Sequence, residues 1–240
     1  MNKGLKLFLG ISYITILIIF VYLVFSFIEI TKLDDFLYYK ELQTSLEKII
    51  GKNLYLNIII FFLFSIIWVS LLGFGSPLLI ISGILFGKWI GTFVSVLSIS
   101  VGALIIYSIA QFFFKDLVHN LFEKRFIKYF HLFKKREFNY FLLFRLCGGL
   151  GIPFGPQNVL PVIFNITKLN YFTASFIGFI PMFFIWNTIG SGLNTYIKQA
   201  DSFSFINLLF NNEIYLPIIF FAVIMLISII IKKRLFGDKN

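Results

Sequence analysis

The side chains best suited to bind a charged ligand lie in residues 145–161, which read RLCGGLGIPFGPQNVLP. Arg145 is the one charged residue of this stretch, and the amides Gln157 and Asn158 follow it. A guanidinium group binds phosphate through two parallel hydrogen bonds, and amide groups can complete such a site. We therefore predict a site for a lipid phosphate, formed by Arg145, Asn158 and Gln157 together with Lys88 from an earlier segment.

A purely structural role competes with ligand binding at each of these positions. Arg145 is equally suited to cap backbone carbonyls freed by a break at Gly148–Gly151, and both roles stay open. For Asn158 and Gln157 we favour hydrogen bonding to the opened backbone over lining a polar path. For Lys88 we favour snorkelling of its amine to the membrane interface over substrate contact.

Glycine and proline residues interrupt the apolar sequence around these residues. Glycine lets the backbone leave helical geometry, and proline removes an amide donor. Broken backbone at membrane depth is tolerated only where protein or a watery cavity surrounds it. We therefore predict re-entrant, broken-helix segments, with structural hinges at Gly75, Pro77, Gly83, Gly87, Gly151, Pro153, Phe154, Gly155, Pro156, Pro161, Gly178, Pro181 and Gly190.

The composition is that of an integral membrane protein. Of 240 residues, 59% are hydrophobic and 13% are charged, whereas soluble domains carry roughly 25% charged residues. The net charge of +10 lies beside apolar runs rather than in one stripe, which argues against nucleic-acid binding. One cysteine, and two histidines with no cysteine or carboxylate cluster around them, predict no disulfide, metal or cofactor. We also find no catalytic constellation and expect no enzyme.

Alternation of apolar and charged segments predicts an all-α chain. The expected elements are an N-terminal transmembrane helix (1–28), an amphipathic connector (29–53), a re-entrant hairpin (54–87), a transmembrane helix (89–114), a basic cytoplasmic loop (115–137), a second re-entrant hairpin (138–165), a transmembrane helix (167–192), and a loop, C-terminal transmembrane helix and basic tail (193–240).

Charge counting supports two re-entrant hairpins. If residues 54–87 enter and leave on one side, the slightly acidic segments 29–53 and 193–213 lie outside, and the basic loop and tail lie inside with both termini. The hairpins then open to opposite sides as an inverted repeat, a common plan in transporters. An offset of 80 residues superposes Lys88 on Lys168 and Ser95 on Ser175.

Residues 54–192 resemble the VTT-domain membrane proteins, the superfamily of DedA and SNARE-associated Golgi proteins. The first half carries the family's pattern of proline followed by spaced glycines in Pro77-Leu-Leu-Ile-Ile-Ser-Gly-Ile-Leu-Phe-Gly-Lys-Trp-Ile-Gly91, continued by Gly102 and Tyr107. The second half matches in Arg145, Pro153-Phe154, Asn158, Gly178, Pro181 and Gly190.

Two departures place the chain within that superfamily. Gln111 stands where the family often has arginine, and no acidic residue occurs between Glu47 and Asp116, where the DedA branch carries carboxylates. The chain therefore resembles the SNARE-associated branch more closely, and a proton-coupled mechanism is not carried over.

The resemblance implies movement of phospholipids or lipid-linked phosphates between leaflets. The expected partners are membrane lipids with anionic head groups and a second copy of the chain, and we expect a bacterial inner (plasma) membrane protein. The alternative is a non-transporting membrane scaffold or trafficking factor that docks partners through the basic loop at 115–137.

Overall fold

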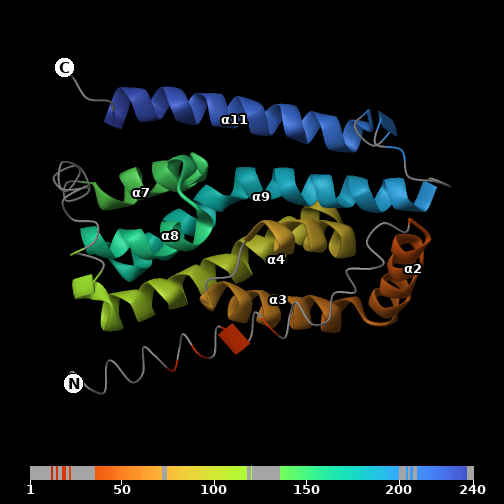
Figure 1. The fold of residues 1–240 in the computed structure, drawn as a ribbon, viewed down its shortest axis with the longest axis horizontal. Coiled ribbons are helices and arrows are strands. Elements are labelled where there is room, and N and C mark those ends of the chain that lie inside the picture. Colours follow the sequence, from red (N-terminus) through yellow and green to blue (C-terminus); the bar gives the residue numbers. More distant parts are fainter. Residues whose placement is uncertain are drawn as a thin grey trace.

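Every regular element in the described part of the chain is a helix (Figure 1). The structure, a computed structural model, describes residues 36–71, 75–117, 136–199 and 210–236, with isolated positions between 12 and 22, at 120, and between 204 and 207. The predicted all-α class is confirmed for these residues. The predicted N-terminal helix, apart from isolated positions, and most of the basic loop at 115–137 lie outside them.

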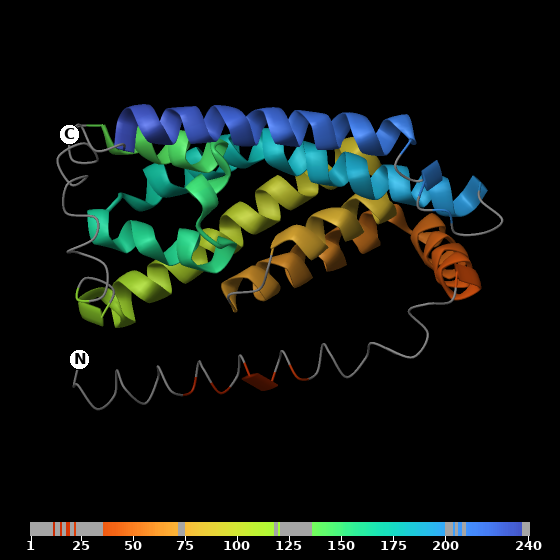
Figure 2. The ribbon, with the colours of Figure 1, turned by 45° about the horizontal axis from the view of Figure 1, so that its top comes forward.

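Helix α2 (Phe36–Lys52) occupies most of the predicted connector. Its end is marked by Asn53, whose side chain accepts a hydrogen bond of 3.1 Å from the Leu56 amide and so caps the next helix. The helix axis turns by 111° at this point, so α2 lies across one end of the molecule (Figures 1 and 2). Gln43 ties α2 to the core by donating to Asn194 Oδ1 at 3.1 Å.

The first hairpin consists of α3 (Leu54–Ser70) and the first part of α4 (Gly75–Phe113). α3 begins beside α2 and ends near the middle of the molecule, and the first part of α4 returns toward the α2 end (Figures 1 and 2). α4 breaks at Gly87, where φ is 72° and ψ is 176°; glycine tolerates this conformation because it has no Cβ. The second part of α4 then runs to the opposite end.

The second hairpin begins at that opposite end with α7 (Glu137–Leu146). The chain turns through the 3₁₀ segment η3 (Gly148–Gly151) and returns through α8 (Phe154–Val159) and η4 (Leu160–Phe164). Three glycines of the turn have positive φ, between 60° and 82°, a region that side chains disfavour. The turn therefore requires glycine at these three positions.

Two long helices complete the described chain. α9 (Lys168–Gln199) runs to the α2 end, and α11 (Asn212–Phe236) lies beside it and returns (Figures 1 and 2). The helix does not end at residues 190–192 as predicted, because α9 continues through them to Gln199. A Cβ at Gly192 would press on Glu213 at the start of α11, so close helix contact explains this glycine.

The core lies where α4 and α9 cross. A Cβ at Gly83 would collide with the backbone of Asn187, and one at Gly190 would collide with the backbone of Ile80. Small residues allow such close approach of helices in membranes. The small residues of the second part of α4 are buried, as predicted for a packed interior helix: Gly91, Ser95, Ser98, Ser100, Gly102 and Ala103.

α4 and α9 are each long and apolar enough to span a membrane, and the bent pair α2–α3 makes a third candidate if it counts as one broken span. The apolar stretch of α11, Asn212–Ile227, is shorter. The chain is thus an integral membrane protein with apolar spanning helices.

Candidate functional site

Arg145 lies in the last turn of α7, and its side chain is only 1% exposed. Nε donates to Ser175 Oγ at 3.1 Å, and Nη2 donates to Asn158 Oδ1 and to the Tyr171 hydroxyl, both at 2.8 Å. Nη1 makes a weaker contact with Gln157 Oε1 at 3.5 Å. These five residues, which we call the arginine cluster, unite the three predicted residues of the second hairpin with two from α9.

Aromatic rings enclose the guanidinium group. Its central carbon lies 4.8 Å from the ring centre of Phe141, 5.4 Å from that of Tyr171 and 4.7 Å from that of Phe179. Such contacts attract a cation to the negative face of the ring. Tyr171 is itself stacked on Tyr107 of α4, with ring centres 4.3 Å apart. The second part of α4 thereby packs against the arginine cluster through Tyr107.

All side-chain oxygens that bind Arg145 belong to neutral groups. Within the described residues, no carboxylate pairs with it; the ion pairs found there are Lys88–Glu213 and Lys198–Glu47. A charge at membrane depth costs a few kcal/mol or more unless it is paired or wetted. The arginine cluster therefore keeps a net positive charge in the interior of the protein.

Gln157, not Arg145, caps the broken backbone of the second hairpin. Its Nε2 donates to the carbonyl of Gly148 at 3.1 Å and to that of Ile152 at 2.5 Å. Among the described contacts, Arg145 donates to side chains alone. The capping role that the sequence left open for Arg145 is thus corrected, and the favoured backbone role is found at Gln157.

A second polar centre lies where the first hairpin meets the second part of α4 and α9. Ser82 donates to Asn187 Oδ1 and lies 2.7 Å from Ser95 Oγ. Asn187 donates in turn to the carbonyl of Phe183, one turn earlier on α9, at 2.8 Å. Ser82, Ser95 and Asn187 are each 0% exposed. This serine–asparagine cluster contains no charged group, and its three side chains bond to one another.

The tips of the two hairpins meet. A Cβ on Gly75, at the start of α4, would lie 3.5 Å from the ring of Phe154, at the start of α8. The Phe154 ring lies 6.1 Å from that of Phe179, which covers Arg145. The arginine cluster is therefore closed off where the two broken segments touch.

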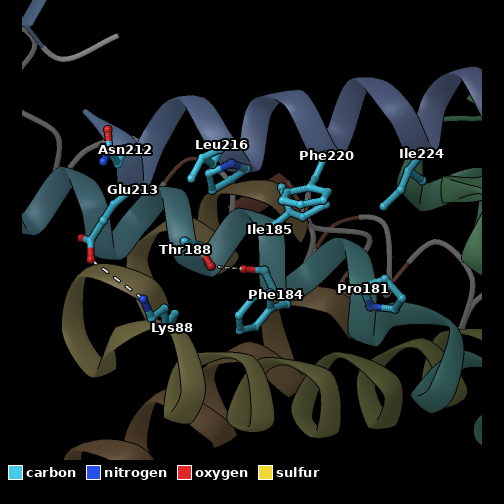
Figure 3. Close-up of a pocket in the computed structure, with 11 residues that line it drawn as sticks. Lys88, Pro181, Phe184, Ile185, Thr188, Asn212, Glu213, Leu216, Phe220 and Ile224 are labelled. Carbon is cyan, nitrogen blue, oxygen red and sulfur yellow. Dashed lines mark hydrogen bonds and ion pairs between the residues drawn. The ribbon is translucent and has the colours of Figure 1, made fainter. Parts of the chain in front are cut away.

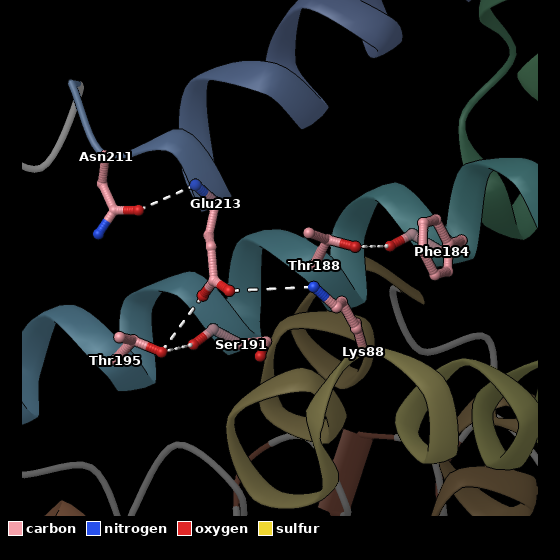
Figure 4. Close-up of polar contacts among 7 residues, drawn as sticks. All are labelled: Lys88, Phe184, Thr188, Ser191, Thr195, Asn211 and Glu213. Atoms are coloured by element: carbon pink, nitrogen blue, oxygen red, sulfur yellow. Dashed lines mark hydrogen bonds and ion pairs between the residues drawn. The ribbon is translucent and has the colours of Figure 1, made fainter.

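Lys88 does not join the arginine cluster. It follows the break in α4 and lies near the α2 end, where its Nζ is 3.9 Å from Glu213 Oε1 of α11 (Figure 4). Thr195 donates to the other carboxylate oxygen of Glu213 at 3.2 Å. The Lys88 side chain is 38% exposed, as expected for an amine that reaches the membrane interface.

The predicted hinges divide into two groups. Gly87 and Gly151 have positive φ at true breaks, and the others near a break begin or shape short segments: Gly75, Pro77, Pro153, Phe154, Gly155, Pro156 and Pro161. Gly83, Gly178, Pro181 and Gly190 instead lie inside continuous helices, which corrects the prediction. Close packing explains the glycines; a Cβ at Gly178, for example, would collide with Arg145 Cβ.

Five residues of the two clusters are absent from the predicted site: Ser82, Ser95, Tyr171, Ser175 and Asn187. The offset of 80 residues, which superposes Ser95 on Ser175, is a signal for two of them, because these serines lie in the two different clusters. The sequence around the other three gives no comparable signal.

The VTT domain matches residues 69–192, which is more than half of the chain. The match contains both clusters and both breaks, whereas α2, most of α3 and α11 lie outside it. No curated protein and no solved structure matches the chain significantly. The chain belongs to the VTT-domain family of integral membrane proteins, within the DedA and SNARE-associated superfamily.

Proposed function

We propose that this protein moves phospholipids or lipid-linked phosphates between the leaflets of a bilayer. One observation carries the proposal: Arg145 is buried, positively charged and surrounded by neutral partners. Because a membrane protein gains no stability by keeping an unpaired charge, such a residue marks the path of a ligand of opposite sign. A phosphate group fits the guanidinium fork.

The loosest partner of Arg145 indicates where the phosphate binds. Nη1 contacts Gln157 at 3.5 Å, the outer limit of a hydrogen bond, while Nε and Nη2 bind at 3.1 Å or less. A phosphate oxygen that replaces Gln157 gains a charge-assisted bond and leaves the others intact. Because the tips at Gly75 and Phe154 close this site, they separate when a lipid enters.

The two hairpins form an inverted repeat in this proposal. Tyr107 of α4 donates to the carbonyl of Ile166 and stacks on Tyr171 in the second half. Asn187 of α9, 80 residues after Tyr107, lies against Gly91, 80 residues before Tyr171. Each long helix thus contacts the other half at equivalent positions, which supports the repeat. In this orientation the α2 end of the molecule faces outward. Within the superfamily, we propose that the chain belongs to the SNARE-associated branch.

Reconstitution tests the proposed transport. Vesicles with purified protein and a labelled anionic phospholipid should show rapid movement between leaflets, and Arg145→Gln should slow it by about tenfold or more, the effect of one lost charge-assisted bond. Arg145→Lys should retain part of the rate, because lysine keeps the charge without the fork.

Arg136→Gln is the matched control, because Arg136 is exposed at the start of the same helix. If Arg145→Gln folds normally and transports at the wild-type rate, the proposal is wrong. A scaffold that acts through residues 115–137, which lie mostly outside the described residues, would then be favoured.

Cysteine accessibility tests the inverted repeat. In a Cys147→Ser background, Ser76→Cys and Pro156→Cys place probes at exposed positions 80 residues apart, one beside each hairpin tip. An impermeant reagent should reach residue 76 from outside and residue 156 from inside. Labelling of both from the same side would contradict the repeat.

A further inference from the structure

A second feature outside the arginine cluster is a groove between α9 and α11 (Figure 3). Its volume is about 530 Å³, within the range of small-molecule sites. The walls are largely apolar and include Phe184 and Ile185 of α9 and Leu216, Phe220 and Ile224 of α11. Because α11 lies outside the matched VTT domain, the groove adds a surface that the domain does not provide by itself.

One end of the groove carries two opposite charges. Lys88 and Glu213 face each other there at 3.9 Å, with side chains 38% and 41% exposed (Figures 3 and 4). Glu213 is held by Thr195, which donates to its carboxylate, and its amide donates to Asn211 Oδ1 at 2.9 Å. A long ion pair between half-exposed groups contributes little stability. A ligand with stronger contacts can therefore replace it.

The length of the groove matches one leaflet. From Glu213 to Ile224, α11 rises by about 16 Å, at 1.5 Å for each residue. Half of the hydrocarbon thickness of a bilayer is about 15 Å. The groove is thus long enough to hold an acyl chain over the depth of one leaflet.

We propose that this groove binds a phospholipid with a zwitterionic head group that contains a primary amine, such as phosphatidylethanolamine. Lys88 binds the phosphate, Glu213 accepts hydrogen bonds from the ammonium group, and one acyl chain lies along α11. The two charges of the protein are opposite in sign to the two charges of the head group that they would bind. A quaternary amine has no N–H to donate to Glu213, and a glycerol head group has no positive charge.

This site is independent of transport through the arginine cluster. Its polar groups lie near the α2 end of the molecule, on α4, α9 and α11, whereas Arg145 lies on α7 in the second hairpin. A variant at the groove can thus change lipid binding while the arginine cluster stays intact.

Native mass spectrometry of the full chain tests the assignment. Purified protein in detergent receives equal amounts of phosphatidylethanolamine, phosphatidylcholine and phosphatidylglycerol with identical acyl chains. We expect the ethanolamine lipid to be retained about tenfold more than the choline lipid, the effect of one charge-assisted hydrogen bond. Glu213→Gln should remove this preference, Lys88→Gln should weaken binding of all three lipids, and Leu216→Trp should do the same by filling the groove.

Glu47→Gln is the matched control, because Glu47 pairs with Lys198 at similar exposure and away from the groove. It should leave lipid retention unchanged. Equal retention of the ethanolamine and choline lipids by the wild-type chain would overturn the proposal, as would preference for the glycerol lipid. An ethanolamine preference that survives in Glu213→Gln would do so too. The wild-type comparison decides even if a variant fails to fold.

Discussion

The two hairpins share a plan but differ in the chemistry of their centres. Each has a helix that ends near the middle of the molecule, a returning broken segment and a long helix. The first centre is made of two hydroxyls and an amide, and the second contains Arg145. The serine–asparagine cluster joins the two parts of α4 to α9 with neutral groups alone, so packing beside a helix break in this protein does not require a charge. Hydrogen bonding to α8 and α9 gives the Arg145 side chain a structural role, but it does not explain why that side chain is charged, and the proposed binding of phosphate does.

The same isosteric substitution should have opposite effects in the two centres. Asn187→Asp buries a carboxylate with no cation and loses the bond to the carbonyl of Phe183, at a cost of about 3–5 kcal/mol. Asn158→Asp places its carboxylate against Arg145 Nη2, where Asn158 Oδ1 now lies at 2.8 Å. That variant should keep its stability but lose transport, because the carboxylate competes with phosphate.

Melting temperatures in detergent distinguish the two variants. Asn187→Asp should melt more than about 6 °C below the wild type, given about 2–4 °C for each kcal/mol in a chain of this size, and Asn158→Asp should melt near the wild type. An equal decrease in melting temperature for both variants would show that the arginine cluster has no positive charge available to pair with the new carboxylate.

Substitutions of buried glycines should have smaller effects that also distinguish the two centres. Gly83→Ala pushes a methyl group into the backbone of Asn187, so it should cost about 2–3 kcal/mol. Gly178→Ala pushes on Arg145 Cβ and displaces the guanidinium, so its main effect should be on transport. Unfolding followed by tryptophan fluorescence, together with the vesicle assay, measures both quantities.

Gly51→Ala provides the control, because no atom lies within 4 Å of the added Cβ and the site is in α2. It should raise stability slightly, since alanine favours helix over glycine by about 1 kcal/mol. If Gly83→Ala and Gly178→Ala affect transport and stability in the same proportion, the proposed division between a packing centre and a binding centre fails.

The smallest predicted effects come from single hydroxyls. Tyr107→Phe leaves the buried carbonyl of Ile166 without its tyrosine donor, at a cost of about 1–2 kcal/mol. Ser95→Ala should cost less than about 1 kcal/mol, because Ser82 keeps its bond to Asn187. Tyr107→Phe should therefore lower the melting temperature more than Ser95→Ala. The reverse order would show that the tyrosine bond to the second hairpin contributes less to stability than the serine–asparagine cluster does.

The breaks in the chain were predictable from the sequence because glycine and proline act locally. Gly87 and the glycines from 148 to 151 adopt the positive φ values that a turn of this kind requires. The meeting of Arg145, Gln157 and Asn158 was predictable for the same reason: a turn between them returns the chain to the arginine within thirteen residues.

Contacts between distant segments were not predictable. Ser175 and Asn187 both lie on α9 among other hydroxyl and amide side chains, and no local pattern tells which neighbour each of them faces. Lys88 was assigned to the phosphate site because of its charge, but packing of α11 against α9 gives it Glu213 as a partner instead. Glycines inside helices were assigned as hinges because a sequence does not distinguish a bend from a close contact.

Pro181 has a consequence for how the two halves communicate. It lies midway along α9 between Ser175 of the arginine cluster and Asn187 of the serine–asparagine cluster. Because proline has no amide hydrogen, α9 lacks one rung of its backbone ladder there and bends more easily than elsewhere. α9 nevertheless stays continuous through Pro181, so this missing backbone hydrogen bond lies inside the one helix that carries residues of both clusters.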